Sequence, residues 1–213
     1  DHQEVGIVQP KILDLKNKNY FEYAGAGGGY IDQLGYPFCR GRIFQSVEMD
    51  EGQYDDTIEI FWATGACMFI KKDLYWSLGG LDPQYFAHQE EIDLCWRAHQ
   101  QGFKVYYTGQ SKVYHLGGST LSNMNPKKTF LNFRNSLFTI TKNLPKKQLA
   151  PIVLARLLLD GVAVFHFLFQ IKPMHAFAIV RAHFSYYNNM KSMYKKRKND
   201  ILSMKYYRTK SIV

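Results

Sequence analysis

Three carboxylates lie close together in residues 89–97, which read QEEIDLCWR. The pattern predicts a helix start, with Glu90, Glu91 and Asp93 in its first turn. Arg97 follows Asp93 by four residues, so these two side chains can form an ion pair. The positive end of a helix dipole favours carboxylates, so capping is one interpretation of the cluster. Crowded carboxylates also raise one another's pKa, which suits a general base, and composition leaves both interpretations open.

The carboxylates lie within an alternation of strands and helices. We expect strands at 5–13, 58–62, 66–70, 103–108 and 112–115, and helices at 72–78 and about 89–101. Strand, helix, turn, helix and strand in this order indicate an α/β fold. At 213 residues with 46% apolar composition, the chain can bury one full core.

Two loop-like segments precede the helices. Residues 23–44 are rich in glycine, but the triple glycine at 27–29 lacks the spacing of a phosphate-binding fingerprint. We interpret this segment as a long surface loop, with a flexible flap over a ligand as the alternative. Residues 48–59 are acidic but fail the offsets of a calcium loop, so we expect a solvated acidic loop.

The net charge of +9 is divided unevenly along the chain. Residues 1–120 hold 10 basic and 16 acidic side chains, a net −6, whereas residues 121–213 hold 17 and 2, a net +15. From about residue 126 onward we expect helices. This division excludes a uniformly basic nucleic-acid-binding fold. It also indicates that the basic part has a contact partner of its own.

Residues 152–171 form the most apolar stretch. On a helical wheel their polar side chains share one arc: Arg156, Asp160, His166 and Gln170. Arg156 and Asp160 are four apart, so we expect them to pair. The stretch is either a helix packed on its own domain or an interfacial helix on an anionic bilayer surface. No window of about 18 uncharged apolar residues occurs, which argues against an ordinary membrane span.

The remaining composition points to a reducing compartment. Three cysteines are too few for a disulfide framework, and no two are spaced as CxxC. The chain opens at Asp1 without a signal-peptide pattern, and we interpret it as a segment of a longer protein.

Four motifs in fixed order carry a resemblance to a known family. They are residues 61–70 (FWATGACMFI), 79–97 (GGLDPQYFAHQEEIDLCWR), 102–105 (GFKV) and 113–119 (VYHLGGS). Together they resemble the second half of bacterial family-2 glycosyltransferases, especially rhamnosyltransferase-like members that build cell-surface polysaccharide. The likeness covers roughly residues 1–145. It implies a partial GT-A (Rossmann-like) α/β domain at 1–125, followed by basic amphipathic helices at 126–213.

The resemblance implies inverting transfer of a sugar from a nucleotide-diphosphate donor to an acceptor hydroxyl. Glu91 is then the first candidate for the base that takes the acceptor proton, and Glu90 is the second. Asp93 belongs to the same motif, and the resemblance implies that Asp93 and Arg97 form its orienting pair. The implied substrate-binding residues are Trp62, Thr64, Gly65, Ala66, Arg97 and Gly118.

His115 matches a position that contacts a divalent metal in some GT-A enzymes, so Mg²⁺ or Mn²⁺ is expected with the full-length enzyme. A lone histidine at a strand end is more often structural, and these ions prefer oxygen ligands. No Asp-x-Asp precedes the first strand, so much of the donor site is expected to be absent. The chain alone is then expected to transfer little or no sugar.

Two hypotheses follow. The first is the acceptor-side, catalytic part of a glycosyltransferase at the cytoplasmic face of the inner membrane, acting on a glycan or lipid-linked acceptor. The second is a membrane-surface or nucleic-acid binding module without catalysis. The apolar stretch before the basic tail favours an anionic membrane surface over nucleic acid. A truncated sheet also favours a homodimer that covers an exposed edge.

Overall fold

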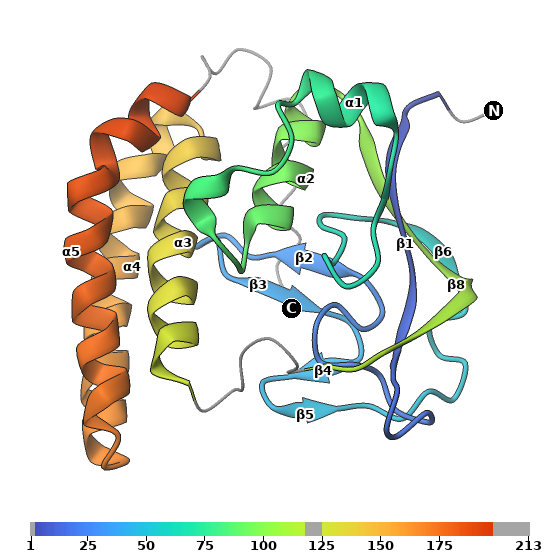
Figure 1. Ribbon diagram of the computed structural model, residues 1–213, viewed down its shortest axis with the longest axis horizontal. Coiled ribbons are helices and arrows are strands. Elements are labelled where there is room, and N and C mark those ends of the chain that lie inside the picture. The colour runs from blue at the N-terminus through green and yellow to red at the C-terminus, as the bar shows by residue number, and fades with distance from the viewer. Residues whose placement is uncertain (1–2, 118–124, 198–213) are drawn as a thin grey trace.

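The computed structural model describes residues 3–117 and 125–197. Its main sheet has four strands in the order β6-β8-β1-β7 (Figure 1). These strands are β1 (Val5–Asp14), β6 (Thr57–Ile60), β7 (Phe69–Ile70) and β8 (Lys104–His115). β1 and β8 pair in parallel at the centre, and the short edge strands β6 and β7 are antiparallel to their neighbours. Pairing of a sheet edge in a homodimer stays a prediction.

β8 is one continuous strand where the sequence predicts two. Its pairing with β1 shifts between Pro10 and Lys11, which lie opposite Thr108 and Lys112. The extra residues 109–111 form the irregularity that separates the two predicted strands. Pro10 is tolerated in this central strand because it lies at the register shift.

The glycine-rich segment is not a surface loop, because its glycines are buried. It forms two small antiparallel pairs, β2 (Gly29–Ile31) with β3 (Pro37–Cys39), and β4 (Arg42–Ile43) with β5 (Ser46–Val47). At Gly29 an added Cβ would lie 2.1 Å from the ring of Trp62. Glycine therefore lets the backbone pack directly on the indole, which the sequence pattern did not reveal.

The acidic segment is also less solvated than its composition indicates. Lys11 on β1 is fully buried, and its Nζ forms ion pairs with Asp50 and Asp55. Lys112 on β8 lies 3.2 Å from the second oxygen of Asp50, whose side chain is 6% exposed. These pairs attach the segment to the sheet.

The helices of the body follow the sequence prediction closely. They are α1 (Lys72–Ser77), the 3-10 turn η1 (Pro83–Tyr85) and α2 (Glu90–Gln100). α2 lies between the sheet and α3 (Figure 1). Trp96 and His99 of α2 pack on the ring of Phe61, and His99 Nε2 lies 2.8 Å from the Phe61 carbonyl oxygen. The strand β6 and the helix α2 are therefore joined through Phe61.

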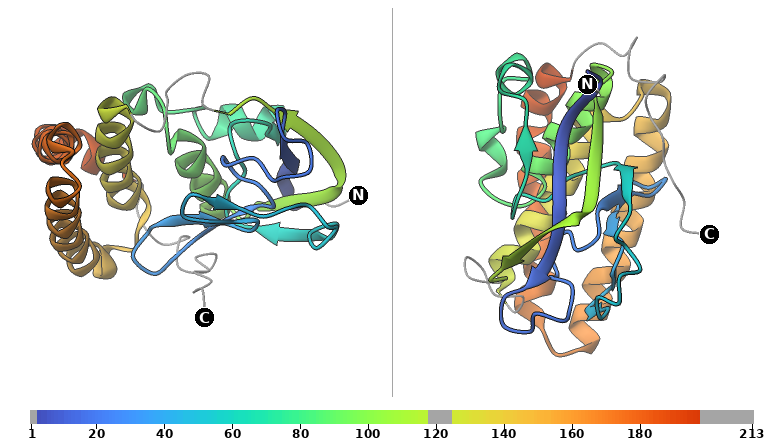
Figure 2. Two further views of the ribbon diagram at one scale, coloured as in Figure 1. Left: turned by 90° about the horizontal axis from the view of Figure 1, so that it is seen from below. Right: turned by 90° about the vertical axis from the view of Figure 1, so that its right-hand side faces the viewer.

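Three long helices form a separate layer, seen edge-on in Figure 2. They are α3 (Pro126–Asn143), α4 (Lys146–Phe169) and α5 (Pro173–Lys196). Asn125 caps α3 by accepting a hydrogen bond from Lys127 N at 2.9 Å, and proline occupies the first helical position. The expected α/β class with C-terminal helices is confirmed. The division at residue 125 stays a prediction, and α3 packs on both α2 and α5.

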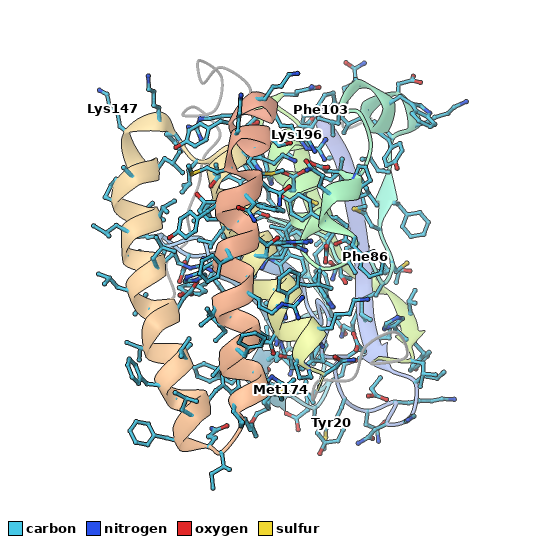
Figure 3. The ribbon with its side chains drawn as sticks, turned by 60° about the vertical axis from the view of Figure 1, so that its left-hand side comes forward. Tyr20, Phe86, Phe103, Lys147, Met174 and Lys196 are labelled. Atoms are coloured by element: carbon cyan, nitrogen blue, oxygen red, sulfur yellow. The ribbon has the colours of Figure 1, made fainter. Side chains whose placement is uncertain are left out.

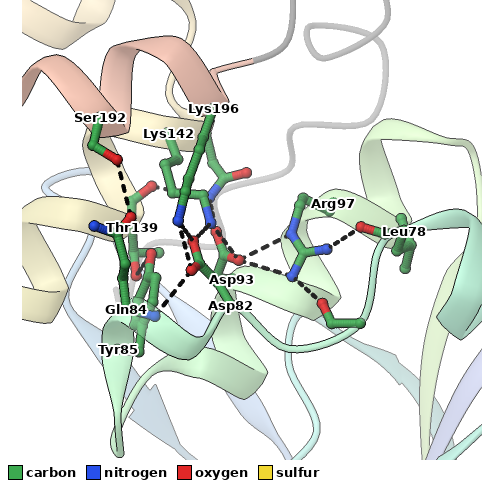
Figure 4. Close-up of polar contacts among 12 residues, drawn as sticks. Leu78, Asp82, Gln84, Tyr85, Asp93, Arg97, Thr139, Lys142, Ser192 and Lys196 are labelled. Atoms are coloured by element: carbon green, nitrogen blue, oxygen red, sulfur yellow. Dashed lines mark hydrogen bonds and ion pairs between the residues drawn. The ribbon is translucent and has the colours of Figure 1, made fainter.

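Two buried carboxylates attach α2 and its approach to the helical layer (Figure 4). Lys142 of α3 lies 2.8 Å from both Asp82 and Asp93. Lys196 of α5 pairs with Asp82 at 2.7 Å. Burial alone would raise the pKa of Asp82, but hydrogen bonds from the two lysines lower it to about 2.

The polar arc of α4 is divided: Arg156 and Asp160 point inward, whereas His166 and Gln170 are exposed. Arg156 is 2% exposed, donates to the carbonyl oxygen of Leu34 at 3.1 Å and lies over the Tyr36 ring. Asp160 is fully buried and pairs with His183 of α5 at 2.9 Å. The predicted pairing of Arg156 with Asp160 is therefore wrong, because each finds a partner on a neighbouring segment.

The outward faces of α4 and α5 are apolar. The exposed large side chains are Leu154, Leu158, Leu159, Val162, Phe165, Leu168, Phe169, Ile171, Met174, Phe177, Val180, Phe184, Tyr187, Met190 and Tyr194, here called the apolar face. Among the described helices, α4 alone is long and apolar enough to cross a membrane by length and composition, a test that a soluble core helix also passes. Only 11% of its most apolar window is buried.

Asp82→Asn tests the attachment of the helical layer. Because the folded pKa of Asp82 lies below its unfolded value near 4, its charge stabilises the fold above that pH. This contribution is lost as the pH falls from about 4 to 2. We expect the variant to lose about 2 kcal/mol at pH 7 and progressively less below pH 4, measured by urea unfolding.

Asp73→Asn is the matched control, because Asp73 is an exposed aspartate on α1. Equal losses for the two variants at pH 7, or a pH-independent loss for Asp82→Asn, would contradict the assignment.

Candidate active site

Glu90 and Glu91 begin α2 and keep part of their hydrogen-bonding capacity unused. One carboxylate oxygen of each, Oε2, is buried and has no hydrogen-bond partner among the described residues. Burial, followed by repulsion from Glu90, raises the pKa of Glu91 to about 8. Burial also raises the pKa of Glu90. A buried, unpartnered carboxylate that holds its proton near neutral pH suits proton transfer.

The backbone that leads into α2 is strained. Phe86, His88 and Gln89 have φ values of 67°, 69° and 69°, in the left-handed region that non-glycine residues rarely adopt. Gln89 provides no side-chain cap for the helix. Such strain persists only where surrounding contacts impose it, and it is concentrated at functional sites.

Asn135 and Arg134 of α3 supply those contacts. The Asn135 side-chain amide lies 3.1, 2.8 and 2.8 Å from the carbonyl oxygens of Tyr85, Ala87 and His88. Arg134 donates to the Tyr85 carbonyl at 2.9 Å. One buried amide therefore holds the turn that places the two glutamates. Sequence reasoning missed both α3 residues because they lie more than 40 positions downstream.

Asp93 is fully buried and points into protein. Both of its carboxylate oxygens are bonded to other side chains: Arg97 at 2.9 Å, Lys142 at 2.8 Å and Asn143 at 2.8 Å. The expected ion pair with Arg97 is present. Arg97 also donates to the carbonyls of Leu78 and Gly80, at 2.6 and 2.9 Å (Figure 4). This geometry gives Asp93 and Arg97 a positioning role for α2, and their direct contact with substrate stays a prediction.

Four of the implied substrate-binding residues lie in the connection between β6 and β7 and are here called the wall: Trp62, Thr64, Gly65 and Ala66. Trp62 is buried, and its Nε1 donates to the Tyr30 carbonyl at 2.7 Å. Its indole packs on Gly29, so it supports the wall from behind. Gly65 is exposed, and an added Cβ there would meet nothing within 4 Å. Gly65 therefore borders open space, as a residue that admits a substrate would.

Thr64 and Ala66 are held by a buried glutamine that sequence reasoning missed. Gln9 on β1 accepts from Thr64 N at 2.8 Å and donates to the Gly25 carbonyl at 3.0 Å. The Thr64 hydroxyl accepts from Ala66 N at 3.2 Å. Gln9 is fully buried, and the oxygen and the nitrogen of its side-chain amide both hydrogen-bond to the backbone, which fixes this turn.

His115 lies at the end of β8, where its Nδ1 faces Glu22 Oε2 at 3.5 Å. Among the described residues no group of three His, Cys, Asp or Glu side chains could hold a metal ion. His115 and Glu22 alone do not complete an oxygen-rich site for Mg²⁺ or Mn²⁺. The divalent cation stays a prediction. Gly118 lies outside the described residues.

His88 is a further candidate residue of the active site, and the sequence analysis did not identify it. Its Nε2 is buried without a partner among the described residues. Burial, followed by the positive charge of Lys128, lowers the pKa of His88. The imidazole is therefore neutral at neutral pH and lies one residue from the segment that begins α2.

Asn135→Ala tests whether α3 imposes the strained turn. Removing the amide leaves buried carbonyls without a donor, so we expect a loss of about 2 kcal/mol in the free energy of unfolding. Asn132→Ala is the control, since it makes the same change on the same helix and its side chain forms no hydrogen bond among the described residues. Urea unfolding compares the two, and equal losses would refute the role of Asn135.

Comparison with known proteins gives consistent relatives. The O-antigen biosynthesis protein RfbC of Myxococcus xanthus is 28% identical over 112 residues, covering 53% of this chain and 8% of that protein. The N-acetylglucosaminyl-diphospho-decaprenol L-rhamnosyltransferase of Mycobacterium tuberculosis is 30% identical over 88 residues, covering 41% and 28%. The rhamnosyltransferase WbbL of Escherichia coli is 31% identical over 65 residues, covering 30% and 24%.

The matches therefore span less than a third of the length of each relative. A family model described as "Glycosyltransferase like family 2" matches residues 1–130, which is more than half of the 213 residues. The matched range holds the main sheet, the strained turn and α2 with its glutamates. The mixed α/β body is consistent with part of a GT-A fold, and the chain belongs to the family-2 glycosyltransferases.

Proposed function

We propose that this chain supplies the acceptor-side and catalytic-base part of an inverting glycosyltransferase. The observation that carries the proposal is the glutamate pair at the start of α2, with its unpartnered oxygens and raised pKa. The donor is a nucleotide-diphosphate sugar. The acceptor is a hydroxyl of a lipid-linked glycan, the class that the name of the M. tuberculosis relative specifies for that protein.

In the proposed step the acceptor oxygen attacks the anomeric carbon of the donor sugar. The new carbon–oxygen bond forms as the bond from that carbon to the diphosphate breaks, and the nucleoside diphosphate leaves. The Glu91 carboxylate accepts the proton of the acceptor hydroxyl, so no charge accumulates on the attacking oxygen. The open space at Gly65 provides access beside the wall that Gln9 fixes.

The proposal assigns much of the donor site to residues outside these 213. No Asp-x-Asp occurs in the sequence, and the matched relatives are several times longer than the matched regions. We therefore expect this chain alone to transfer little or no sugar. Robust turnover of a nucleotide sugar by the 213-residue chain would overturn this part of the proposal.

A location at the cytoplasmic face of the inner membrane is the second element of the proposal. The apolar face of α4 and α5 is unusually large for a free protein surface and supports contact with lipid. Lys147 and Lys196 lie at one end of these helices and Met174 near the other (Figure 3). This arrangement favours contact with an anionic bilayer surface over the alternative of nucleic-acid binding without catalysis.

Glu91→Gln in the full-length protein tests the base. We expect turnover to fall at least 100-fold while donor binding is kept, because Gln is isosteric but accepts no proton. Turnover is followed as release of nucleoside diphosphate from a panel of nucleotide sugars. In the unmodified protein the rate should rise with pH through about 8, since the base acts in its deprotonated form.

Glu90→Gln separates the two candidates. Removing the Glu90 charge lowers the pKa of Glu91, so the pH profile should move to lower pH while activity is retained. If Glu90→Gln abolishes turnover and Glu91→Gln does not, Glu90 is the base. Glu51→Gln, at an exposed glutamate, is the control for the loss of one charge.

Phe165→Glu tests membrane contact in a vesicle flotation assay. Phe165 is 64% exposed on α4, and we expect the bound fraction on anionic vesicles to fall at least tenfold. Phe69→Glu is the matched control, because Phe69 is 65% exposed on the edge strand β7. Equal recovery of both variants, or of the parent chain on neutral and anionic vesicles at low salt, would count against this contact.

A further inference from the structure

A pocket lies between the first turns of α3 and α5, at the edge of the apolar face. Its volume is about 320 Å³. Phe130, Met174 and Phe177 provide apolar walls, and Lys127 and Arg181 provide two cations. A pocket of this size with aliphatic and aromatic walls and two positive charges matches an amphiphile with an anionic head.

The two cations are available for a ligand. Lys127 and Arg181 are exposed, and neither forms an ion pair with a carboxylate in the part of the chain that the structure describes. Lys127 Nζ lies 4.6 Å from the Phe86 ring, and the Arg181 guanidinium lies 5.6 Å from the Phe130 ring. The first turn of α3 has no acidic residue, so the helix dipole adds to the positive field.

The apolar walls continue onto the surface proposed to meet lipid. Met174 and Phe177 are 63% and 58% exposed and belong to both the pocket and the apolar face. Figure 3 places Met174 at the end of the hairpin away from Lys147 and Lys196. A chain of hydrocarbon can therefore leave the pocket along apolar side chains without crossing a polar surface.

The pocket also borders the turn that leads into the catalytic helix. Lys127 lines the pocket and lies over Phe86, which is five residues before Glu91. Two turns further along α3, Asn135 holds the same turn through the Ala87 and His88 carbonyls. One helix therefore carries both a pocket cation and the contacts that place the glutamates.

We propose that this pocket binds the diphosphate of a polyprenyl-linked acceptor, with Lys127 and Arg181 contacting the phosphate oxygens and Phe130, Met174 and Phe177 contacting the first isoprene units. The inference rests on the proposed function, which names a lipid-linked acceptor but no residues that bind it. Phosphate oxygens suit the two cations, and the arginine can donate two hydrogen bonds to one phosphate.

Binding of three probes to the 213-residue chain tests the proposal, measured by isothermal titration below the micelle concentration. Farnesyl diphosphate presents both head and tail, inorganic diphosphate only the head, and farnesol only the tail. We expect farnesyl diphosphate to bind at least tenfold more tightly than either of the others. Equal affinity for inorganic diphosphate would indicate a soluble phosphate ligand, and equal affinity for farnesol an apolar surface alone; either result overturns the proposal.

Arg181→Gln and Lys127→Gln should each weaken binding of farnesyl diphosphate about fivefold. Lys191→Gln is the control, because it removes one exposed charge from α5 outside the pocket. If all three variants bind equally well, the pocket is not the site.

Glu91→Gln should bind farnesyl diphosphate like the parent chain. Loss of turnover in that variant of the full-length protein, without any binding of farnesyl diphosphate to the chain, would support the base and reject the pocket. Failure of the pocket and failure of the proposed chemistry are thus distinguished.

Discussion

Lys142 joins two buried carboxylates that lie on either side of the turn into α2, and the placement of the candidate site depends on it. Asp82 precedes the turn and Asp93 follows it, and both lie 2.8 Å from Lys142 Nζ. Lys196 and Arg97 add the charges that balance the pair. A buried carboxylate is strongly destabilising unless it is paired and hydrogen-bonded. A movement of α2 relative to α3 would separate these ion pairs and leave buried carboxylates unpaired, so the network fixes the two helices against each other. Because Glu90 and Glu91 lie at the start of α2, this network also fixes their position.

Local pattern in the sequence was sufficient for much of the body. The glutamate cluster predicted the start of α2, and spacing predicted the pairing of Asp93 with Arg97. These features depend on residues within a few positions of one another. What holds them does not: Gln9, Asn135 and Lys142 act on segments 40 or more positions away. Long-range polar contacts leave no periodic trace in a single sequence.

Two sequence predictions were wrong for the same physical reason: composition does not reveal which segments and side chains face the protein interior. The glycine-rich segment has the composition of a surface loop, yet its backbone packs on Trp62. The wheel of α4 correctly separated Arg156 and Asp160 from the apolar side chains, but those two polar residues are the buried ones. Partners on other segments, Leu34 and His183, reverse the usual orientation. The same reversal leaves the apolar face outward, which is the basis for the proposed contact with lipid.

Burial and the helix dipole have opposite effects on the pKa values of the α2 glutamates. Capping would lower their pKa, since backbone N–H groups and the dipole stabilise a carboxylate at a helix start by roughly 0.3–2 kcal/mol. The pKa of Glu91 instead rises to about 8. Burial and the charge of Glu90 therefore outweigh the capping contribution. The upward direction is the one that the proposed base needs, because it lets Glu91 exchange a proton near neutral pH.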